Sequence, residues 1–149
     1  ARLNADNDEK RTVLTFGPVS ILPQYQQMGF GKMLIEHSLR KAEGLGYDAV
    51  VIFGCPRYYT GLGFRSCRKY CISSSDGRYP ASMMVRELVP GILAGRKWIY
   101  HESPVMAINE EDALRYDDSL RKMERKYLPS QEEFYIMSHS YIEDETAAD

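Results

Sequence analysis

Two glycines one residue apart, Gly29 and Gly31, lie in the part of this chain whose residue types best suit the binding of a ligand. They lie in the stretch QQMGFG (residues 26–31), between an apolar strand-like run and an amphipathic helical pattern. Glycines at such a junction let the backbone come close to a ligand. The start of the following helix directs unpaired N–H groups and the positive end of the helix dipole toward the same place. The stretch therefore predicts a site for a phosphate or diphosphate group.

Two common glycine motifs do not match this stretch. A P-loop needs a hydroxyl residue after its lysine, but Lys32 is followed by Met33, and the first glycine of that motif is missing. The dinucleotide motif needs a third glycine where this chain has Leu34. The nucleotide-hydrolase and dehydrogenase interpretations therefore both fail on specific residues.

The elements around the glycines form a strand–helix–strand pattern. Apolar residues 12–16 and 19–22 indicate one strand, interrupted at Gly17-Pro18 because proline cannot donate a ladder hydrogen bond. Residues 30–45 show the periodicity of an amphipathic helix. The β-branched and aromatic run 49–53 is typical of a central strand, parallel to the first through a right-handed crossover.

The rest of the chain contains further candidate elements. We expect a helical turn at 57–64, strands at 64–72, 83–89 and 97–101, and helices at 109–127 and 130–139, with a capping box formed by Ser130 and Glu133 at the start of the last helix.

Composition indicates an ordinary globular protein and excludes several functions. The chain has 149 residues, 44% of them hydrophobic and 27% charged, and its net charge of −2 argues against binding to nucleic acid. We expect no membrane span and no signal peptide, and hence a cytoplasmic location. Cys55, Cys67 and Cys71 form no C-x-x-C pair, so we expect reduced thiols and no zinc.

Two motifs together resemble a known superfamily. Gln26, Gly29 and Gly31 fit the pattern Q-x-x-G-x-G, and Tyr59, with the Gly-Phe pair at 63–64, fits Y-x-x-x-G-F. In this order and spacing they are similar to the acyl-CoA-binding region of the GNAT superfamily of N-acetyltransferases, over about residues 14–89. The resemblance implies an α/β (α+β) fold with a mixed, mostly antiparallel sheet, a central splayed pair of parallel strands and flanking helices.

The resemblance also implies a function and a set of site residues. The function is transfer of an acetyl group from acetyl-CoA to a primary amine by direct attack in a ternary complex, with a small-molecule amine or a protein amino group as acceptor and a homodimer as a possible assembly. Tyr59 matches the tyrosine that protonates the departing thiolate. Cofactor contacts fall on the backbone of Val19, Ser20 and Ile21, and on Gln26, Gln27, Met28, Gly29, Phe30, Gly31 and Lys32.

Several roles stay open at the level of sequence. Glu9, His37, His101 and Glu102 all suit a general base by residue type, as does ordered water, and no motif places any of them. Basic residues at 57, 65, 68 and 69 would suit either the ribose phosphate of the cofactor or a solvated surface. A non-catalytic acyl-CoA-binding module, or an α/β domain with no cofactor, remain alternative interpretations.

The chain also departs from the superfamily pattern. The usual fold has further strands and helices before the strand near residue 12, but residues 1–11 leave room for one short strand, so we expect a fragment or a partner chain that supplies the missing layer. Gly54 and the three residues after it replace an asparagine that often binds pantetheine. We divide the chain into an acyl-CoA-binding core (1–108), a helical extension packed on it (109–142) and an acidic tail (143–149).

Overall fold

The computed structural model describes residues 1–124 and 126–143, so the predicted acidic tail beyond Glu143 lies outside the described residues. The strands are β1 (Arg2–Ala5), β2 (Lys10–Thr12), β3 (Ala49–Phe53), β4 (Arg65–Ser66), β5 (Ile72–Ser73), β6 (Met83–Glu87) and β7 (Trp98–His101). The α-helices are α1 (Phe30–Gly44), α2 (Pro56–Tyr59), α3 (Glu110–Ser119) and α4 (Pro129–Ser138).

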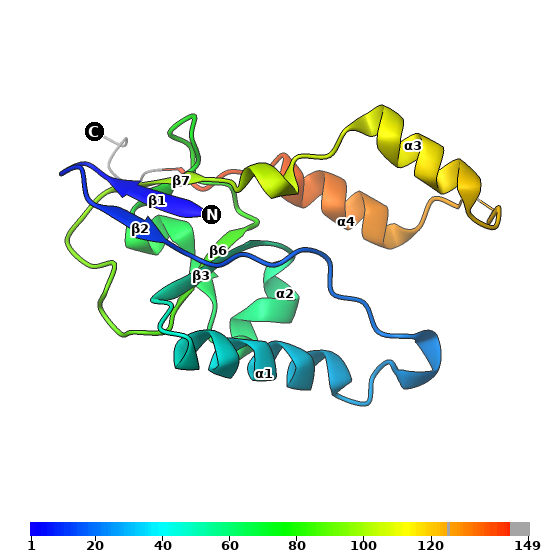
Figure 1. Cartoon of the computed structure of the whole chain (residues 1–149), viewed down its shortest axis with the longest axis horizontal. Coiled ribbons are helices and arrows are strands. Elements are labelled where there is room, and N and C mark those ends of the chain that lie inside the picture. The colour runs from blue at the N-terminus through cyan, green and yellow to red at the C-terminus, as the bar shows by residue number, and fades with distance from the viewer. Residues whose placement is uncertain (125, 144–149) are drawn as a thin grey trace.

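The strands form two small sheets that meet in the middle of the molecule (Figure 1). One has the order β2-β1-β7-β5, in which only the β5–β7 pair is parallel. The other has the order β3-β6-β4 and is antiparallel throughout. A parallel bridge between Leu14 and Val50 joins the chain after β2 to β3. The predicted mixed, mostly antiparallel α+β fold is therefore confirmed.

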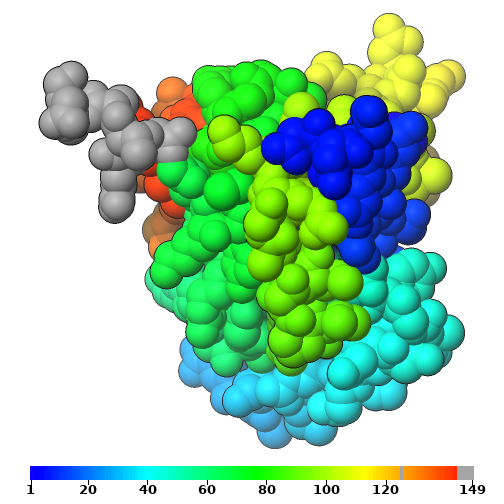
Figure 2. Space-filling model, turned by 90° about the vertical axis from the view of Figure 1, so that its left-hand side faces the viewer, coloured from blue at the N-terminus to red at the C-terminus, as the bar shows by residue number. Residues whose placement is uncertain are grey.

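The N-terminal residues form a hairpin rather than the single short strand that the sequence predicts. Strands β1 and β2 pair around a turn in which Asp8 has a φ of 66°, a value that aspartate tolerates better than most residues. The other edge of β1 pairs with β7. Figure 2 shows the hairpin, in dark blue, lying beside the yellow-green chain that leads into β7.

The core consists of two clusters on opposite faces of β3, because successive strand residues point to opposite sides. Ala49 and Val51 belong to the cluster that also contains Trp98 and Tyr100. Their neighbours Val50 and Ile52 belong to the cluster under α1, which contains Ile35, Leu39, Leu62, Phe64 and Met84. Tyr59 and Phe16 pack against this second cluster. The alternation explains why the run 49–53 is apolar at every position.

Helix α1 follows the predicted range closely. It begins after Gly29, whose φ is 85°, and Gly46, just beyond its end, has a φ of 81°. Ile35, Leu39 and Ala42 form its buried stripe. Leu34 and Leu45, which belong to the same apolar pattern of residues 30–45, are 49% and 67% exposed. The buried stripe is therefore narrower than the sequence pattern indicates.

The two central segments separate after a single bridge. The Leu14 N–H donates to the Ala49 carbonyl at 3.1 Å, and the Val51 N–H donates to the Leu14 carbonyl at 2.9 Å. In the described chain, no hydrogen bond joins residues 15–20 to β3. We call this place, just after Leu14, the split point. The expected splayed pair of parallel segments is present. Its two segments diverge along residues 15–20.

Several sequence predictions of local structure were wrong. Residues 19–22 form no strand, because they leave the sheet at the split point and lack a pairing partner. The predicted strand 64–72 is interrupted by a 3-10 turn, after which Cys71 has a φ of 52°. Helix α4 begins at Pro129, which occupies the first turn, and its cap is the Gln131 side chain accepting from the Leu128 N–H rather than a box formed by Ser130 and Glu133.

The C-terminal helices project away from the sheets (Figure 1). Helix α3 ends at Ser119, eight residues before the predicted Tyr127, and neither α3 nor α4 has a buried residue. The chain after α4 returns to the core, where the Ala81 N–H donates to the Ser140 carbonyl and the Ile142 N–H to the Tyr79 carbonyl. The division into core and packed extension stays a prediction. No helix among the described residues is long and apolar enough to cross a membrane.

Candidate acyl-CoA site

The backbone N–H groups of residues 27–32 lie together at the start of α1 and have no hydrogen-bond acceptor within the described chain. Within the described chain none of them donates a hydrogen bond, and the first helical bond is that from the Met33 N–H to the Gly29 carbonyl. Gln27 and Gly29 both have positive φ values, 61° and 85°. Alternating backbone conformations of this kind turn successive N–H groups toward one concave spot that suits an anion. The structure therefore offers N–H donors at the predicted residues.

Gln26 and Gly31 shape the loop that carries these donors. The Gln26 side chain donates from Nε2 to the Ile21 carbonyl at 2.9 Å, which closes the loop from 21 to 26. A Cβ on Gly31 would lie 3.7 Å from Cγ1 of Ile21, so the helix start rests against Ile21. The Gln26 side chain is thus used within the protein. Met28, Phe30 and Lys32 contribute exposed side chains around the donors.

The segment with Val19, Ser20 and Ile21 is an extended edge with few partners. No main-chain hydrogen bond to another part of the described chain involves residues 19–21, except that the Ile21 carbonyl accepts from Gln26. Val19 is 36% exposed. A polar backbone edge of this kind accepts a further extended segment readily.

Tyr59 lies on the α1 side of the split point. Its ring centroid is 6.1 Å from that of Phe16 and 5.8 Å from that of the fully buried Phe64. Burial raises the pKa of Tyr59, and nearby Cys55 adds to the effect. Its hydroxyl makes no recorded hydrogen bond within the described residues. Tyr59 therefore stays protonated well above neutral pH and has a proton to donate.

Gly54 was not assigned a site role from sequence, yet it controls where the Tyr59 ring lies. A Cβ on Gly54 would come within 2.5 Å of Cε2 of Tyr59, closer than atoms can approach. The Gly54 N–H donates to the Ser82 carbonyl at 2.9 Å, so the backbone at this point is held by the sheet. In the sequence, the position of Gly54 two residues before a proline indicated only the end of a strand. No local sequence pattern predicts the contact between Gly54 and Tyr59.

The four candidate bases lie in different places. Glu9 is paired with Arg11 at 2.7 Å and with Arg96 at 2.6 Å. His37 is exposed on α1. Glu102 Oε1 accepts hydrogen bonds from the Tyr100 hydroxyl at 2.9 Å and from the Ser103 N–H at 2.8 Å. His101 follows Tyr100 on β7, so its side chain points to the opposite face of that strand.

The basic residues considered for the ribose phosphate are mostly engaged within the protein. Arg57 donates to the Tyr58 hydroxyl and pairs with Glu133 at 3.1 Å. Arg65 donates to the carbonyls of Thr60 and Phe64. Arg68 stacks on the Tyr79 ring. Tyr58 is 60% exposed and contacts Arg57.

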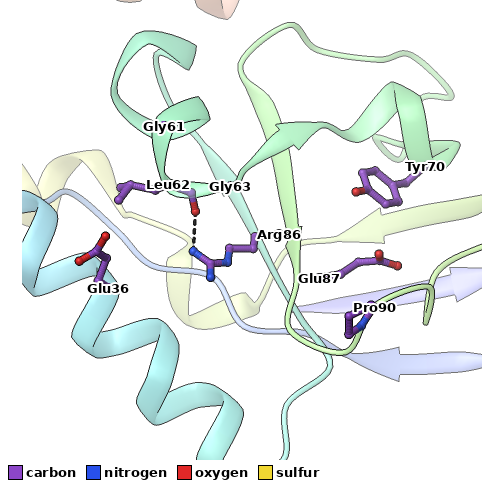
Figure 3. Close-up of a pocket in the computed structure, with 8 residues that line it drawn as sticks. All are labelled: Glu36, Gly61, Leu62, Gly63, Tyr70, Arg86, Glu87 and Pro90. Atoms are coloured by element: carbon purple, nitrogen blue, oxygen red, sulfur yellow. Dashed lines mark hydrogen bonds between the residues drawn. The ribbon is translucent and has the colours of Figure 1, made fainter.

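A hollow of about 440 Å³ lies between α1 and the β6 side of the sheet (Figure 3). Its lining contains Glu36, Gly61, Leu62, Gly63, Tyr70, Arg86, Glu87 and Pro90, none of which is a predicted site residue. Arg86 donates to the Leu62 carbonyl, and Glu87 accepts from the N–H groups of Gly91 and Leu93. Two carboxylates in the lining make this hollow a poor place for a diphosphate.

Two known proteins resemble this chain, one in sequence and one in fold. No family model matches the chain. An uncharacterized N-acetyltransferase of Escherichia coli strain K12, YjhQ, is 31% identical over 70 residues, which are 47% of this chain and 35% of that protein. The crystal structure of the GNAT family N-acetyltransferase YhbS from Escherichia coli, in complex with CoA, superposes with a TM-score of 0.56 at 23% identity, covering 68% of this chain and 57% of that one.

The chain has the GNAT fold. Two motifs predicted this fold, and the superposition on YhbS confirms it. Both of those relatives are N-acetyltransferases, a class of acyltransferase. This chain spans about a third of the length of YjhQ, the curated relative that it matches.

Proposed function

We propose that this GNAT chain is an N-acetyltransferase that moves an acetyl group from acetyl-CoA to a primary amine by direct attack in a ternary complex. The observation that carries the proposal is the set of N–H groups at residues 27–32 that have no hydrogen-bond acceptor in the described chain, beside a main-chain edge at residues 15–20 that pairs with no described strand. The GNAT neighbour YhbS was crystallised with CoA, which supports the same cofactor here.

The backbone would do most of the binding. The N–H groups of residues 27–32 suit the diphosphate of coenzyme A, because the helix dipole of α1 adds a favourable potential there. The main chain of residues 19–21 suits the pantetheine arm, which would align as an added strand. An N–H of the same segment suits the oxygen that gains negative charge during transfer. The cofactor supplies the activated acetyl group, and the protein positions it.

Tyr59 suits the role of the acid that protonates the departing sulfur. Its raised pKa keeps the phenol protonated at neutral pH, and its hydroxyl is not committed to another group of the described chain. Acid assistance of this kind is worth about 10²–10⁴-fold in rate. Tyr59→Phe is therefore expected to lower kcat by roughly 10²-fold while the affinity for coenzyme A stays unchanged.

The direct experiment offers acetyl-CoA and a panel of primary amines to the protein and measures the release of free thiol. The panel contains small amines, polyamines, amino acids and a lysine peptide, because both a small amine and a protein amino group fit the proposal. Turnover that needs both substrates supports the enzyme. Coenzyme A binding without turnover for any amine supports the alternative, a non-catalytic acyl-CoA-binding module. Absence of binding contradicts both.

The proposal extends to the setting of the protein. We infer a cytoplasmic enzyme with no nucleic-acid or membrane partner and a possible homodimer; the net charge of −2 argues against a nucleic-acid partner. Fractionation and the oligomeric mass in solution test these points.

A further inference from the structure

Two consecutive residues at the split point contact different faces of the sheet. Phe16 packs against Tyr59 and Phe64, on the face covered by α1. Thr15 instead interacts with the side chain of Tyr100, which belongs to the core cluster on the other face. The opening beyond Leu14 therefore has Tyr59 on one side and Tyr100 on the other.

Three independent contacts place the end of β7 beside the split point. Thr15 reaches Tyr100. The ring of Phe53, the last residue of β3, lies 5.7 Å from the Tyr100 ring, edge to face. A Cβ on Gly17 would lie 3.9 Å from Cε of Met106, so the Met106 side chain, which follows β7, lies against the diverging segment. Glu102 lies within this stretch, between Tyr100 and Met106.

Hydrogen bonds hold the Glu102 carboxylate in a defined orientation, and they involve only one of its two oxygens. Both of its hydrogen bonds, from the Tyr100 hydroxyl and from the Ser103 N–H, go to Oε1. Oε2 accepts no recorded hydrogen bond from the described residues, and the side chain is exposed. Burial is the main cause that raises the pKa of Tyr100; Thr15 opposes the rise and Glu102 adds to it. Tyr100 thus remains a donor to Glu102 across the neutral range.

We propose that Glu102 is the general base of the transfer reaction and that Tyr100 is the residue that positions it. The inference rests on the proposed function. As the amine nitrogen bonds to the acetyl carbon, a proton passes from that nitrogen to Oε2 of Glu102. The carbon–sulfur bond breaks, and the sulfur takes the Tyr59 hydroxyl proton. Glu102 then gives its proton to water and Tyr59 regains one, so the protein returns to its starting state.

The other candidates are less well placed for this step. Glu9 is held by two arginines, which occupy both of its oxygens. His37 lies on the exposed side of α1, and His101 points to the opposite face of β7 from Tyr100. Of the four candidates, only Glu102 both has a carboxylate oxygen that accepts no hydrogen bond in the described chain and contacts Tyr100, which lies beside the split point.

The test compares Glu102→Gln with Glu43→Gln in the thiol-release assay, using the amine that the parent turns over best. Glu43 is an exposed carboxylate on α1 and controls for loss of one negative charge. We expect Glu102→Gln to lower kcat by about 10²-fold or more, since base assistance contributes 10²–10⁴-fold. Coenzyme A affinity and the melting temperature stay near those of the parent. Glu43→Gln behaves as the parent does.

Two further variants separate a base from a structural role. Glu102→Ala is expected to recover part of its activity when formate is added, because formate replaces the missing carboxylate. Tyr100→Phe keeps the buried ring, so it lowers kcat less than Glu102→Gln and has little further effect in the Glu102→Gln background.

The outcomes are distinct. A parent that turns over amines while Glu102→Gln keeps its full kcat overturns the assignment of Glu102 and leaves the proposed function intact. A fall in kcat that formate does not rescue in Glu102→Ala also overturns the assignment. A parent that releases no thiol with any amine contradicts the proposed function itself.

Discussion

At the residue scale, the lack of a side chain at Gly54 determines where the Tyr59 ring can lie. The sheet holds the Gly54 backbone, and Phe16 and Phe64 bound the Tyr59 ring on other sides. A methyl group at Gly54 would meet the ring at 2.5 Å. We therefore expect Gly54→Ala to push the ring out of place and lower kcat by roughly 10²-fold, as misplacement by about 1 Å can do.

Gly61→Ala is the matched control, because a Cβ there meets nothing within 4 Å. It should leave kcat unchanged. Equal kcat values for the two variants would contradict the positional role of Gly54. The sequence predicted Tyr59 from its motif, whereas the Gly54 contact joins a strand end to a helix and follows only from the packed structure.

At the scale of the element, helix α1 and its two flanking glycines were the most predictable feature. The periodicity, the glycine pair and Gly46 placed both ends of the helix within one residue.

Gly29 and Gly46 have similar φ values of 85° and 81° and open space around them, so an alanine would be strained equally at either position. Each substitution should lower the free energy of unfolding by about 1–2 kcal/mol. Only Gly29→Ala should also weaken coenzyme A binding, which calorimetry can measure; equal affinities would argue against the role of this loop.

The irregular elements were harder to predict for a physical reason. Residues 19–22 are apolar enough for a strand, but a strand needs a hydrogen-bonding neighbour, and the split point removes it. Residues 64–72 likewise read as one strand, although a left-handed Cys71 turns the chain between β4 and β5. Local sequence determines the propensity of a segment to form a strand, whereas strand pairing depends on segments that are distant in the sequence.

At the scale of the whole molecule, an ion-pair network joins the two sheets. Arg11 on β2 pairs with Asp48 at 2.6 Å, just before β3, and with Glu9, which also pairs with Arg96. No sequence pattern signals contacts among residues so far apart. These side chains are only 21–34% exposed, so Arg11→Met should lower the free energy of unfolding by about 1.5–3 kcal/mol.

The exposed Arg78–Asp76 pair provides the comparison for this network. Its side chains are 58% and 46% exposed, and Arg78→Met should cost about 0–1 kcal/mol. Urea unfolding of both variants checks the difference. A smaller effect for Arg11→Met than for Arg78→Met would show that the network does not hold the sheets together.

The most direct test of the central claim is to follow the backbone amide signals by nuclear magnetic resonance while coenzyme A is added. The account predicts that the largest shifts fall on residues 27–32, with smaller shifts along residues 19–21. Shifts gathered instead around Arg86 and the hollow of Figure 3, or no shifts at saturating coenzyme A, would contradict it.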